Sequence, residues 1–169
     1  MSHAPSLSVL MPVYNETSTI KQCLANVLQS SYASEVIIVD DGSTDGTREI
    51  LSKIKNDRVK IYLHDYNLGK GAAVRTAISH AKCDYLLIQD ADLEYDPQDY
   101  AKLIKPVIEG KAIVVYGSRF TGEHRDMLFW HMLGNKFLSL TTNILYNTTL
   151  SDMETCYKLM KRDLVAGFK

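Results

Sequence analysis

The segment Asp84-Tyr-Leu-Leu-Ile-Gln-Asp90-Ala91-Asp92 is the most informative part of this sequence, both for its fold and for its chemistry. Its apolar centre predicts a buried strand, and that strand ends in two carboxylates one residue apart. Negative charge at the end of a buried strand is unfavourable unless a positive group meets it. Divalent cations such as Mg²⁺ and Mn²⁺ take carboxylate oxygens and share their remaining positions with phosphate and water. An isolated pair of this kind is also common in solvated turns, so its meaning depends on its surroundings.

Strands and helices alternate on both sides of this stretch. Apolar runs predict strands at residues 7–13, 35–41, 59–63, 84–89 and 112–116. Helical spacing of apolar residues, or an early proline, predicts helices at residues 20–28, 44–55, 71–81 and 97–109. This alternation predicts a single α/β domain, with a mostly parallel, doubly wound sheet and helices on both faces.

Length and composition exclude several classes of protein. A chain of 169 residues with 46% hydrophobic and 23% charged residues suits one ordinary globular domain. Its net charge of −1 gives no basic excess for nucleic acid. Cys23, Cys83 and Cys156 are too far apart for a disulfide framework or a zinc site, which favours a reducing cytosol. Residues 1–10 lack the pattern of a signal peptide, so we expect none.

Each predicted strand is followed by acids, glycines or a cation. In an open α/β sheet, ligands bind outside the carboxyl ends of the strands, so these segments should form one site. The segments are residues 12–16, 40–43, 67–71, 90–92 and 117–119. Random surface polarity would not be sorted so consistently to one edge of a sheet.

Three side chains of these segments suit a nucleoside. Glu16 and Asp40 can accept hydrogen bonds from a base edge or from ribose hydroxyls, although capping or turn roles are about as common for each. Tyr14 can lie against a nucleobase, although a tyrosine at a strand end more often belongs to the core.

Two further segments suit phosphate. Gly69-Lys70-Gly71 opens a helix, where backbone N–H groups and the helix dipole favour an anion, and Lys70 adds a positive charge. Arg119 follows a glycine–serine pair and can clamp a phosphate with two hydrogen bonds. A surface ion pair is the alternative for Arg119, and it is less expected beside so many acids.

Taken in order, these motifs resemble the family-2 inverting glycosyltransferases with the GT-A fold. Within that family the chain is most similar to the dolichyl-phosphate mannosyltransferase branch and its bacterial polyprenyl-phosphate relatives. The resemblance covers residues 6–165 of one catalytic domain, 1–169. Relatives usually continue well past Lys169, so we expect a chain that is cut short at its C-terminus. The motifs are Pro12-x-Tyr14-Asn15-Glu16, Val39-Asp40-Asp41-Gly42-Ser43-x-Asp45-Gly46-Thr47, Asn67-x-Gly69-Lys70-Gly71, Asp90-Ala91-Asp92 and Gly117-Ser118-Arg119.

The resemblance implies roles for individual residues. Those expected to bind the nucleotide sugar are Pro12, Tyr14, Glu16, Asp40, Asp41, Gly69, Lys70, Asp90, Ala91 and Arg119. Those expected to bind Mg or Mn are Asp90, Asp92 and Glu94, the last at a position where many relatives carry Gln. Those expected to act in catalysis are Asp92, Arg119 and Lys158. Those expected to bind the acceptor are Arg119, Arg125 and Lys158.

The branch also implies the acceptor, a polyprenyl or dolichyl phosphate. Such a phosphate is already ionised and needs nearby cations, whereas a sugar hydroxyl needs a general base. We therefore expect in-line transfer of mannose or glucose from a GDP- or UDP-sugar, with inversion and with a metal ion as Lewis acid. For a hydroxyl acceptor, the candidate bases are Asp152 and Glu154.

Residues 127–150 are rich in Leu, Phe and Trp and contain one Lys and one His. They are too polar for a membrane span and favour an amphipathic hairpin at a membrane surface; another core helix is the alternative. We accordingly expect a peripheral protein at the cytoplasmic face of a membrane.

Two other functions stay open. One is a non-catalytic fragment that binds nucleotide sugars. The other is a nucleotide-dependent oxidoreductase, although its glycine fingerprint would be expected after the first strand.

Overall fold

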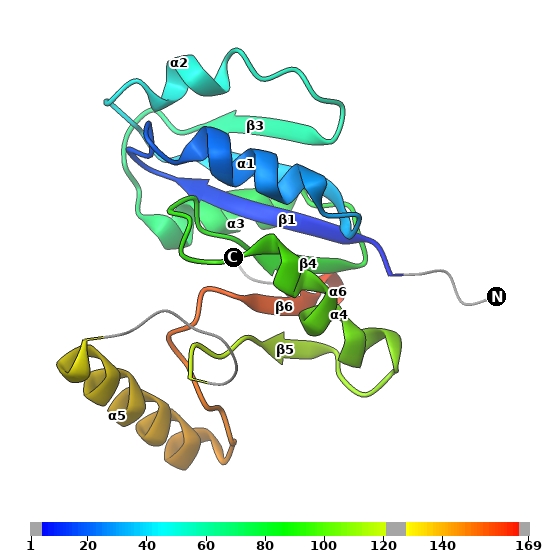
Figure 1. Ribbon diagram of the computed structural model, residues 1–169, viewed down its shortest axis with the longest axis vertical. Helices are drawn as coiled ribbons and strands as arrows, with labels where there is room; N and C mark the ends of the chain where they lie inside the picture. Colours follow the sequence, from blue (N-terminus) through cyan, green and yellow to red (C-terminus); the bar gives the residue numbers. More distant parts are fainter. Residues whose placement is uncertain (1–4, 121–127, 166–169) are drawn as a thin grey trace.

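The computed structural model describes residues 5–120 and 128–165, which form one six-stranded sheet with helices on both faces (Figure 1). The elements are β1 (Leu7–Val13), α1 (Ile20–Gln29), β2 (Ala33–Asp40), α2 (Thr47–Leu51), β3 (Val59–Leu63), α3 (Lys70–His80), β4 (Tyr85–Ile88), the 3₁₀ turn η1 (Pro97–Asp99), α4 (Tyr100–Ile108), β5 (Val114–Tyr116), α5 (Phe129–Tyr146), β6 (Lys158–Lys161) and α6 (Arg162–Val165).

The strand order is β3-β2-β1-β4-β6-β5. The strands β1 to β4 pair in parallel, and β6 lies antiparallel between β4 and β5. This confirms the predicted α/β class and the mostly parallel sheet, and the five predicted strands appear within two residues of their expected bounds.

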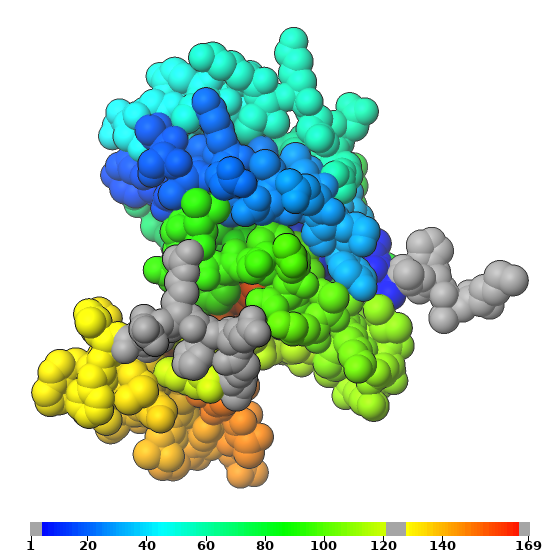
Figure 2. All heavy atoms as spheres, viewed as in Figure 1, coloured from blue at the N-terminus to red at the C-terminus, as the bar shows by residue number. Residues whose placement is uncertain are grey.

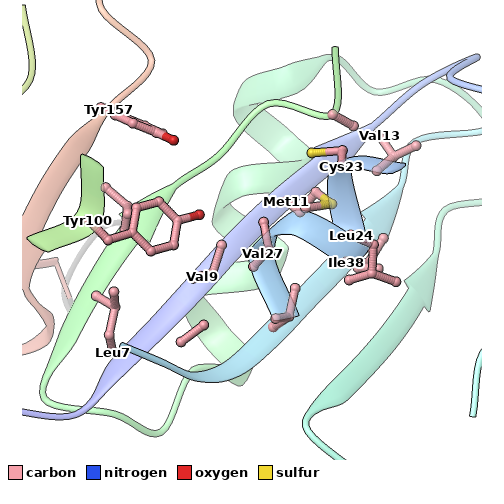
Figure 3. Close-up of a cluster of buried hydrophobic side chains, with 14 of the residues drawn as sticks. Leu7, Val9, Met11, Val13, Cys23, Leu24, Val27, Ile38, Tyr100 and Tyr157 are labelled. Carbon is pink, nitrogen blue, oxygen red and sulfur yellow. The ribbon is translucent and has the colours of Figure 1, made fainter. Parts of the chain in front are cut away.

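The central strands are buried because helices cover both faces of the sheet. Successive residues of a strand point to opposite faces, so Met11 joins the core beneath α1 and α4, whereas Leu10 joins the core beneath α3. In the first of these clusters, Val27 of α1 and Tyr100 of α4 pack near β1 (Figure 3). The two cores fix the sheet as a rigid platform for the loops at its edges.

The predicted helix at residues 44–55 is shorter than expected, because local hydrogen bonds set its start. The side chain of Asp45 accepts hydrogen bonds from the backbone N–H and the hydroxyl of Thr47, at 3.0 and 2.6 Å. Gly46 has a φ of +97°, outside the helical region, so α2 begins only at Thr47. It ends at Leu51, where the next turn tightens to bonds between residues three apart.

Two predictions for the part of the chain that follows β5 need correction. The strand β6 was not predicted, because its sequence Lys-Leu-Met-Lys lacks a clear alternation. The hairpin expected in residues 127–150 is wrong over residues 128–150, because α5 is one continuous helix that ends at Tyr146 and is capped by Asn147, with a φ of +49°. The core-helix alternative is also wrong, since Ser139 is the buried residue of α5.

α5 lies at the far end of the molecule, beyond β5 and away from β1 (Figures 1 and 2). In the described part of the chain, no helix is both long enough and apolar enough to cross a membrane.

Candidate active site

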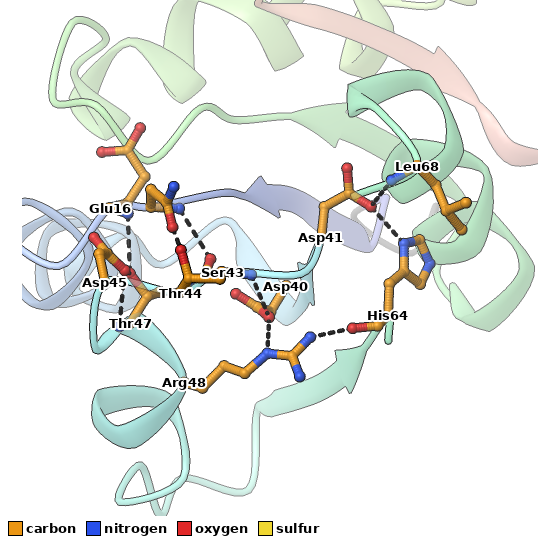
Figure 4. A network of polar contacts seen from close by, with 11 residues as sticks. Glu16, Asp40, Asp41, Ser43, Thr44, Asp45, Thr47, Arg48, His64 and Leu68 are labelled. Atoms are coloured by element: carbon orange, nitrogen blue, oxygen red, sulfur yellow. Dashed lines mark hydrogen bonds and ion pairs between the residues drawn. The ribbon is translucent and has the colours of Figure 1, made fainter. Parts of the chain in front are cut away.

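The carboxyl ends of the parallel strands bring the first two predicted segments into direct contact. Asn15 follows β1, and its N–H donates to the hydroxyl of Ser43, at 2.9 Å, while its side-chain oxygen accepts from the N–H of Thr44 at 2.9 Å. The N–H of Glu16 donates to the hydroxyl of Thr47, at 3.0 Å. These bonds join the segment after β1 to the segment after β2 (Figure 4).

Asp40 ends β2 as a fully buried carboxylate with unequal oxygens. Its Oδ2 accepts hydrogen bonds from Arg48 Nε at 2.6 Å and from the N–H of Ser43 at 3.2 Å (Figure 4). Its Oδ1 is buried and has no hydrogen-bond partner within the described residues. A buried carboxylate oxygen without a partner is rare and unfavourable, so Oδ1 is a candidate acceptor for a ligand N–H or O–H.

Asp41 is different, because both of its oxygens are engaged. Oδ1 accepts from the N–H of Leu68 at 3.0 Å and lies 2.7 Å from His64 Nδ1, and Oδ2 accepts from the N–H of Gly69 at 2.7 Å. Burial alone would raise the pKa of Asp41, but these hydrogen bonds hold it below its usual value. Asp41 therefore fixes the turn that opens α3, and its predicted contact with a nucleoside stays a prediction.

The remaining predicted nucleoside residues lie around the same edge. Tyr14 is 46% exposed at the end of β1, where a ring is accessible to a base. Glu16 is partly buried, and its Oε2 accepts from the hydroxyl of Thr19 at 2.6 Å. Pro12 and Ala91 are buried and shape the backbone beneath the site.

Asp90 and Asp92 follow β4 and have different partners. Asp90 Oδ2 lies 2.6 Å from Lys70 Nζ, and Asp92 Oδ1 accepts from the N–H of Glu94 at 3.0 Å. Over residues 5–120 and 128–165, no three Asp, Glu, His or Cys side chains gather as a metal cluster. The assignment of Asp90, Asp92 and Glu94 to a metal thus stays a prediction. Two carboxylates near the N-terminus of α3 nevertheless fit Mg²⁺ or Mn²⁺, which take several of their ligands from phosphate and water.

A buried polar network fixes the end of β4. The hydroxyls of Tyr100 and Tyr157 both donate to Gln89 Oε1, at 2.8 Å each. Gln89 Nε2 in turn donates to the backbone carbonyl of Asp90 at 2.8 Å. The position of Asp90 is therefore set from within the core.

Arg119 follows β5 and is clamped by Asp152. Its Nε and Nη2 donate to the two carboxylate oxygens at 2.8 and 2.9 Å, and its backbone N–H donates at 3.0 Å. Asp152 is fully buried; burial alone would raise its pKa, but the hydrogen bonds from Arg119 lower it. Asp152 has both oxygens committed to Arg119, which makes it a poor candidate for a general base.

Cations and acids from separate elements line one pocket of about 180 Å³. Lys70, Arg119 and Lys158 supply the positive charge, and Asp90, Glu94 and Glu154 the negative charge. Burial lowers the pKa of Lys158, whose ammonium donates to the carbonyl of Thr155 and lies 5.3 Å from the Tyr116 ring. Arg125, also predicted to bind the acceptor, lies outside the described residues. A larger groove of about 1560 Å³ adjoins the pocket and shares Arg119 with it.

Sequence reasoning missed Arg48, His64 and Gln89, which orient Asp40, Asp41 and Asp90. Arg48 and His64 are separated from Asp40 and Asp41 along the chain, and Gln89 lies inside the core. The local spacing of residues therefore does not reveal these contacts. The apolar run that ends in Gln89-Asp90 was the one available signal, since a buried amide needs hydrogen-bond partners.

Comparison with known proteins places this geometry in a family. The sequence profile described as "Glycosyl transferase family 2" matches residues 8–168. The low-salt glycan biosynthesis hexosyltransferase Agl6 of Haloferax volcanii is 33% identical over 167 residues, which are 95% of this chain and 39% of that protein. The UDP-N-acetylglucosamine–dolichyl-phosphate N-acetylglucosaminyltransferase of Methanococcus voltae is 31% identical over 166 residues, 87% of this chain and 66% of that protein.

Among solved structures, the mannosyltransferase PcManGT from Pyrobaculum calidifontis, in complex with GDP-Man and Mn²⁺, has a TM-score of 0.70. It is 24% identical, and the match covers 97% of this chain and 46% of that one. This likeness confirms the GT-A-like fold. The chain spans less than two thirds of the length of these relatives. Because the family profile matches nearly the whole length of this chain, the chain belongs to glycosyl transferase family 2.

Proposed function

We propose that this chain is the catalytic domain of a glycosyltransferase. It would transfer a hexose, mannose or glucose, from a GDP- or UDP-sugar to a polyprenyl or dolichyl phosphate with inversion. The observation that carries the proposal is the open carboxyl edge of the sheet. At this edge Asp40 has a buried oxygen without a partner in the described residues, and the residues after β4 and β5 help to line a pocket that contains both cations and acids.

The donor would bind across the ends of β1, β2 and β4. Asp40 Oδ1 would accept an N–H from the nucleobase, and Tyr14 would lie against the ring. The N-terminus of α3, held by Asp41, would face the diphosphate, with Lys70 adding charge. Asp90 and Asp92 would hold Mg²⁺ or Mn²⁺, which stabilises the departing nucleoside diphosphate as a Lewis acid.

The charges in the pocket favour a phosphate acceptor over a hydroxyl. Arg119 and Lys158 can bring an anionic acceptor to an anionic donor, and an ionised phosphate needs no general base. With Asp152 committed to Arg119, a hydroxyl acceptor would depend on the exposed Glu154. The name of the Methanococcus voltae relative, which includes dolichyl phosphate, supports the same choice.

The surface of α5 supports a membrane-bound acceptor. Its polar stripe faces the protein: Ser139 Oγ accepts from the N–H of Met153 at 3.0 Å, and Asn143 exchanges two hydrogen bonds with Leu150. Its large apolar side chains are exposed, and the helix contains no acid. The exposed large hydrophobic residues of α5 are Phe129, Trp130, Leu133, Phe137, Leu138, Leu140, Ile144, Leu145 and Tyr146. An outward apolar face of this kind suits the surface of a bilayer, so we place the protein peripherally at the cytoplasmic face of a membrane.

The first test is calorimetric titration of the folded chain with GDP and with UDP, each with and without Mn²⁺. Metal-dependent binding of GDP is expected for a mannosyl donor, and preference for UDP for glucosyl transfer. Binding of neither nucleotide would contradict the proposed donor site.

The second test is transfer of labelled sugar from the preferred donor to polyprenyl phosphate in detergent. Arg119→Ala should spare binding of the nucleoside and lower turnover, and Arg119→Lys, which keeps a cation beside Asp152, controls for folding. Donor binding with no transfer to any acceptor would favour a non-catalytic binding fragment.

A further inference from the structure

Lys70 and Asp90 form an ion pair at the point where two ligands of opposite charge are expected. Lys70 Nζ lies 2.6 Å from Asp90 Oδ2. The side chains are 56% and 21% exposed, so the pair stands at the mouth of the small pocket, in reach of solvent. An ammonium in this position neutralises the carboxylate and occupies an oxygen that a divalent cation would use.

We propose that Lys70 is an exchangeable counter-ion. It holds Asp90 while the site is without donor, and it turns to the donor's diphosphate when a divalent cation takes Asp90. The idea rests on the proposed function, because it requires a diphosphate and a metal at this edge. It adds a positioning role that makes the two ligands bind cooperatively.

The backbone beneath Lys70 is fixed, so the exchange needs only a change of side-chain rotamer. The N–H of Gly69 donates to Asp41 Oδ2 at 2.7 Å and to Asn67 Oδ1 at 2.9 Å, and Gly69 has a φ of +90°. Above this anchor, Lys70 carries its charge on a flexible four-carbon stem. Arg119, in contrast, is held by Asp152 through both of its side-chain hydrogen bonds.

The exchange has a signature that other roles of Lys70 lack. If Lys70 competes with the metal, its removal should strengthen binding of metal alone and weaken binding of nucleotide with metal. A purely structural lysine would weaken both on removal. A lysine that only contacts phosphate would leave the affinity for metal alone unchanged.

The experiment is titration of the full chain with Mn²⁺ alone, and with GDP or UDP at saturating Mn²⁺. Lys70→Gln should lower the Kd of Mn²⁺ alone about two- to fivefold, the effect of breaking a partly exposed ion pair. It should raise the Kd of the nucleotide by a similar factor or more, and Lys70→Arg should restore both values toward wild type. Lys111→Gln is the matched control, since it breaks a 2.7 Å surface ion pair with Glu109 remote from the site.

An unchanged or higher Kd for Mn²⁺ in Lys70→Gln, or no measurable Mn²⁺ binding by that variant, would overturn the proposal. In the Asp90→Asn background, Lys70→Gln should no longer strengthen Mn²⁺ binding; if it still does, the competition is not for Asp90. Failure of the proposed function is seen separately, as absence of GDP and UDP binding by the wild-type chain.

Discussion

Glu35 and Asp40 are carboxylates at opposite edges of the sheet, and their hydrogen bonding differs. At the amino edge, Glu35 accepts hydrogen bonds from the hydroxyl of Ser8 and the N–H of Lys82, at 2.7 Å each, and pairs with the ammonium of Lys60. At the carboxyl edge, Asp40 keeps a buried oxygen without a partner in the described residues, and Asp90 forms an ion pair with the half-exposed Lys70. A carboxylate with all its oxygens satisfied belongs to the structure, whereas one left open is available to a ligand.

The comparison predicts that mutations at the two edges have opposite consequences. The largest effect is expected at the carboxyl edge. Asp92→Asn removes a predicted metal ligand, and loss of a Lewis acid worth several kcal/mol should lower turnover roughly 100- to 1000-fold. The thermal midpoint should hardly change, because the Asp92 side chain accepts a hydrogen bond from the N–H of Glu94, and the amide oxygen of Asn can accept the same bond. Transfer assays and thermal melts measure the two quantities.

Asp163→Asn is the matched control, because Asp163 forms only a long surface ion pair of 3.4 Å with Lys161. It should keep full activity. If Asp92→Asn retained metal-dependent nucleotide binding, the metal assignment would have to be abandoned.

The opposite result is expected at the amino edge. Glu35→Gln leaves the hydrogen-bonding shape in place but removes the charge that Lys60 faces. The loss should be about 2 kcal/mol of unfolding free energy, below the usual 3–5 for a fully buried pair because Lys60 reaches solvent. Urea unfolding measures it, and Mn²⁺ binding should be unchanged. Glu109→Gln, in the exposed pair with Lys111, should change stability by less than about 0.5 kcal/mol. Equal losses in both variants would mean that burial does not distinguish the two pairs.

The pH dependence of stability tests the role of the Glu35 charge in a second way. Burial alone would raise the pKa of Glu35, but hydrogen bonds from Lys60, Ser8 and Lys82 lower it to about 2. A carboxyl group with a lowered folded pKa stabilises the fold above its unfolded value, near 4.5, and loses that contribution as pH falls toward 2. The difference in unfolding free energy between the wild type and Glu35→Gln should therefore become smaller as the pH is lowered from 6 to 2.5. A constant difference would contradict the role of the charge.

The sequence predicted one half of this comparison well. Apolar runs revealed the parallel strands, and strand ends rich in acids and glycines revealed the carboxyl edge, because both signals are local. Glu35 was placed only as the start of a strand, since its partners come from three other segments. Lys70 and Asp90 were each expected in the site, but their pairing depends on the packing of α3 against the sheet. Local patterns reveal which carboxylates lie at the carboxyl edge. Only the tertiary structure shows which of them already have hydrogen-bond partners within the protein.

The helices show a similar limit of sequence-based prediction. Apolar periodicity predicts that one face of a helix is apolar, but it does not say whether that face points to the core or to solvent. In α1 the apolar residues Ile20 and Val27 are buried, as expected for a helix on a core. In α5 the polar Ser139 is the buried residue, and the apolar side chains face outward. Contacts of α5 with Leu150 and Met153 help to fix this orientation, and the local sequence pattern does not reveal them.

The smallest effect on stability is expected on that outward face. Trp130 and Phe137 are 75% and 67% exposed, so replacing both with Ser should change the unfolding free energy by about 0.5 kcal/mol or less. Their loss should nevertheless lower the fraction of protein that floats with anionic lipid vesicles, because apolar area drives interfacial binding. Ser139→Ala is the converse control: it removes the acceptor for the N–H of Met153, so it should destabilise by about 1 kcal/mol and leave flotation unchanged. Equal flotation of the wild type and the double Ser variant would show that α5 does not face a membrane, and the acceptor would then have to reach the pocket from solution.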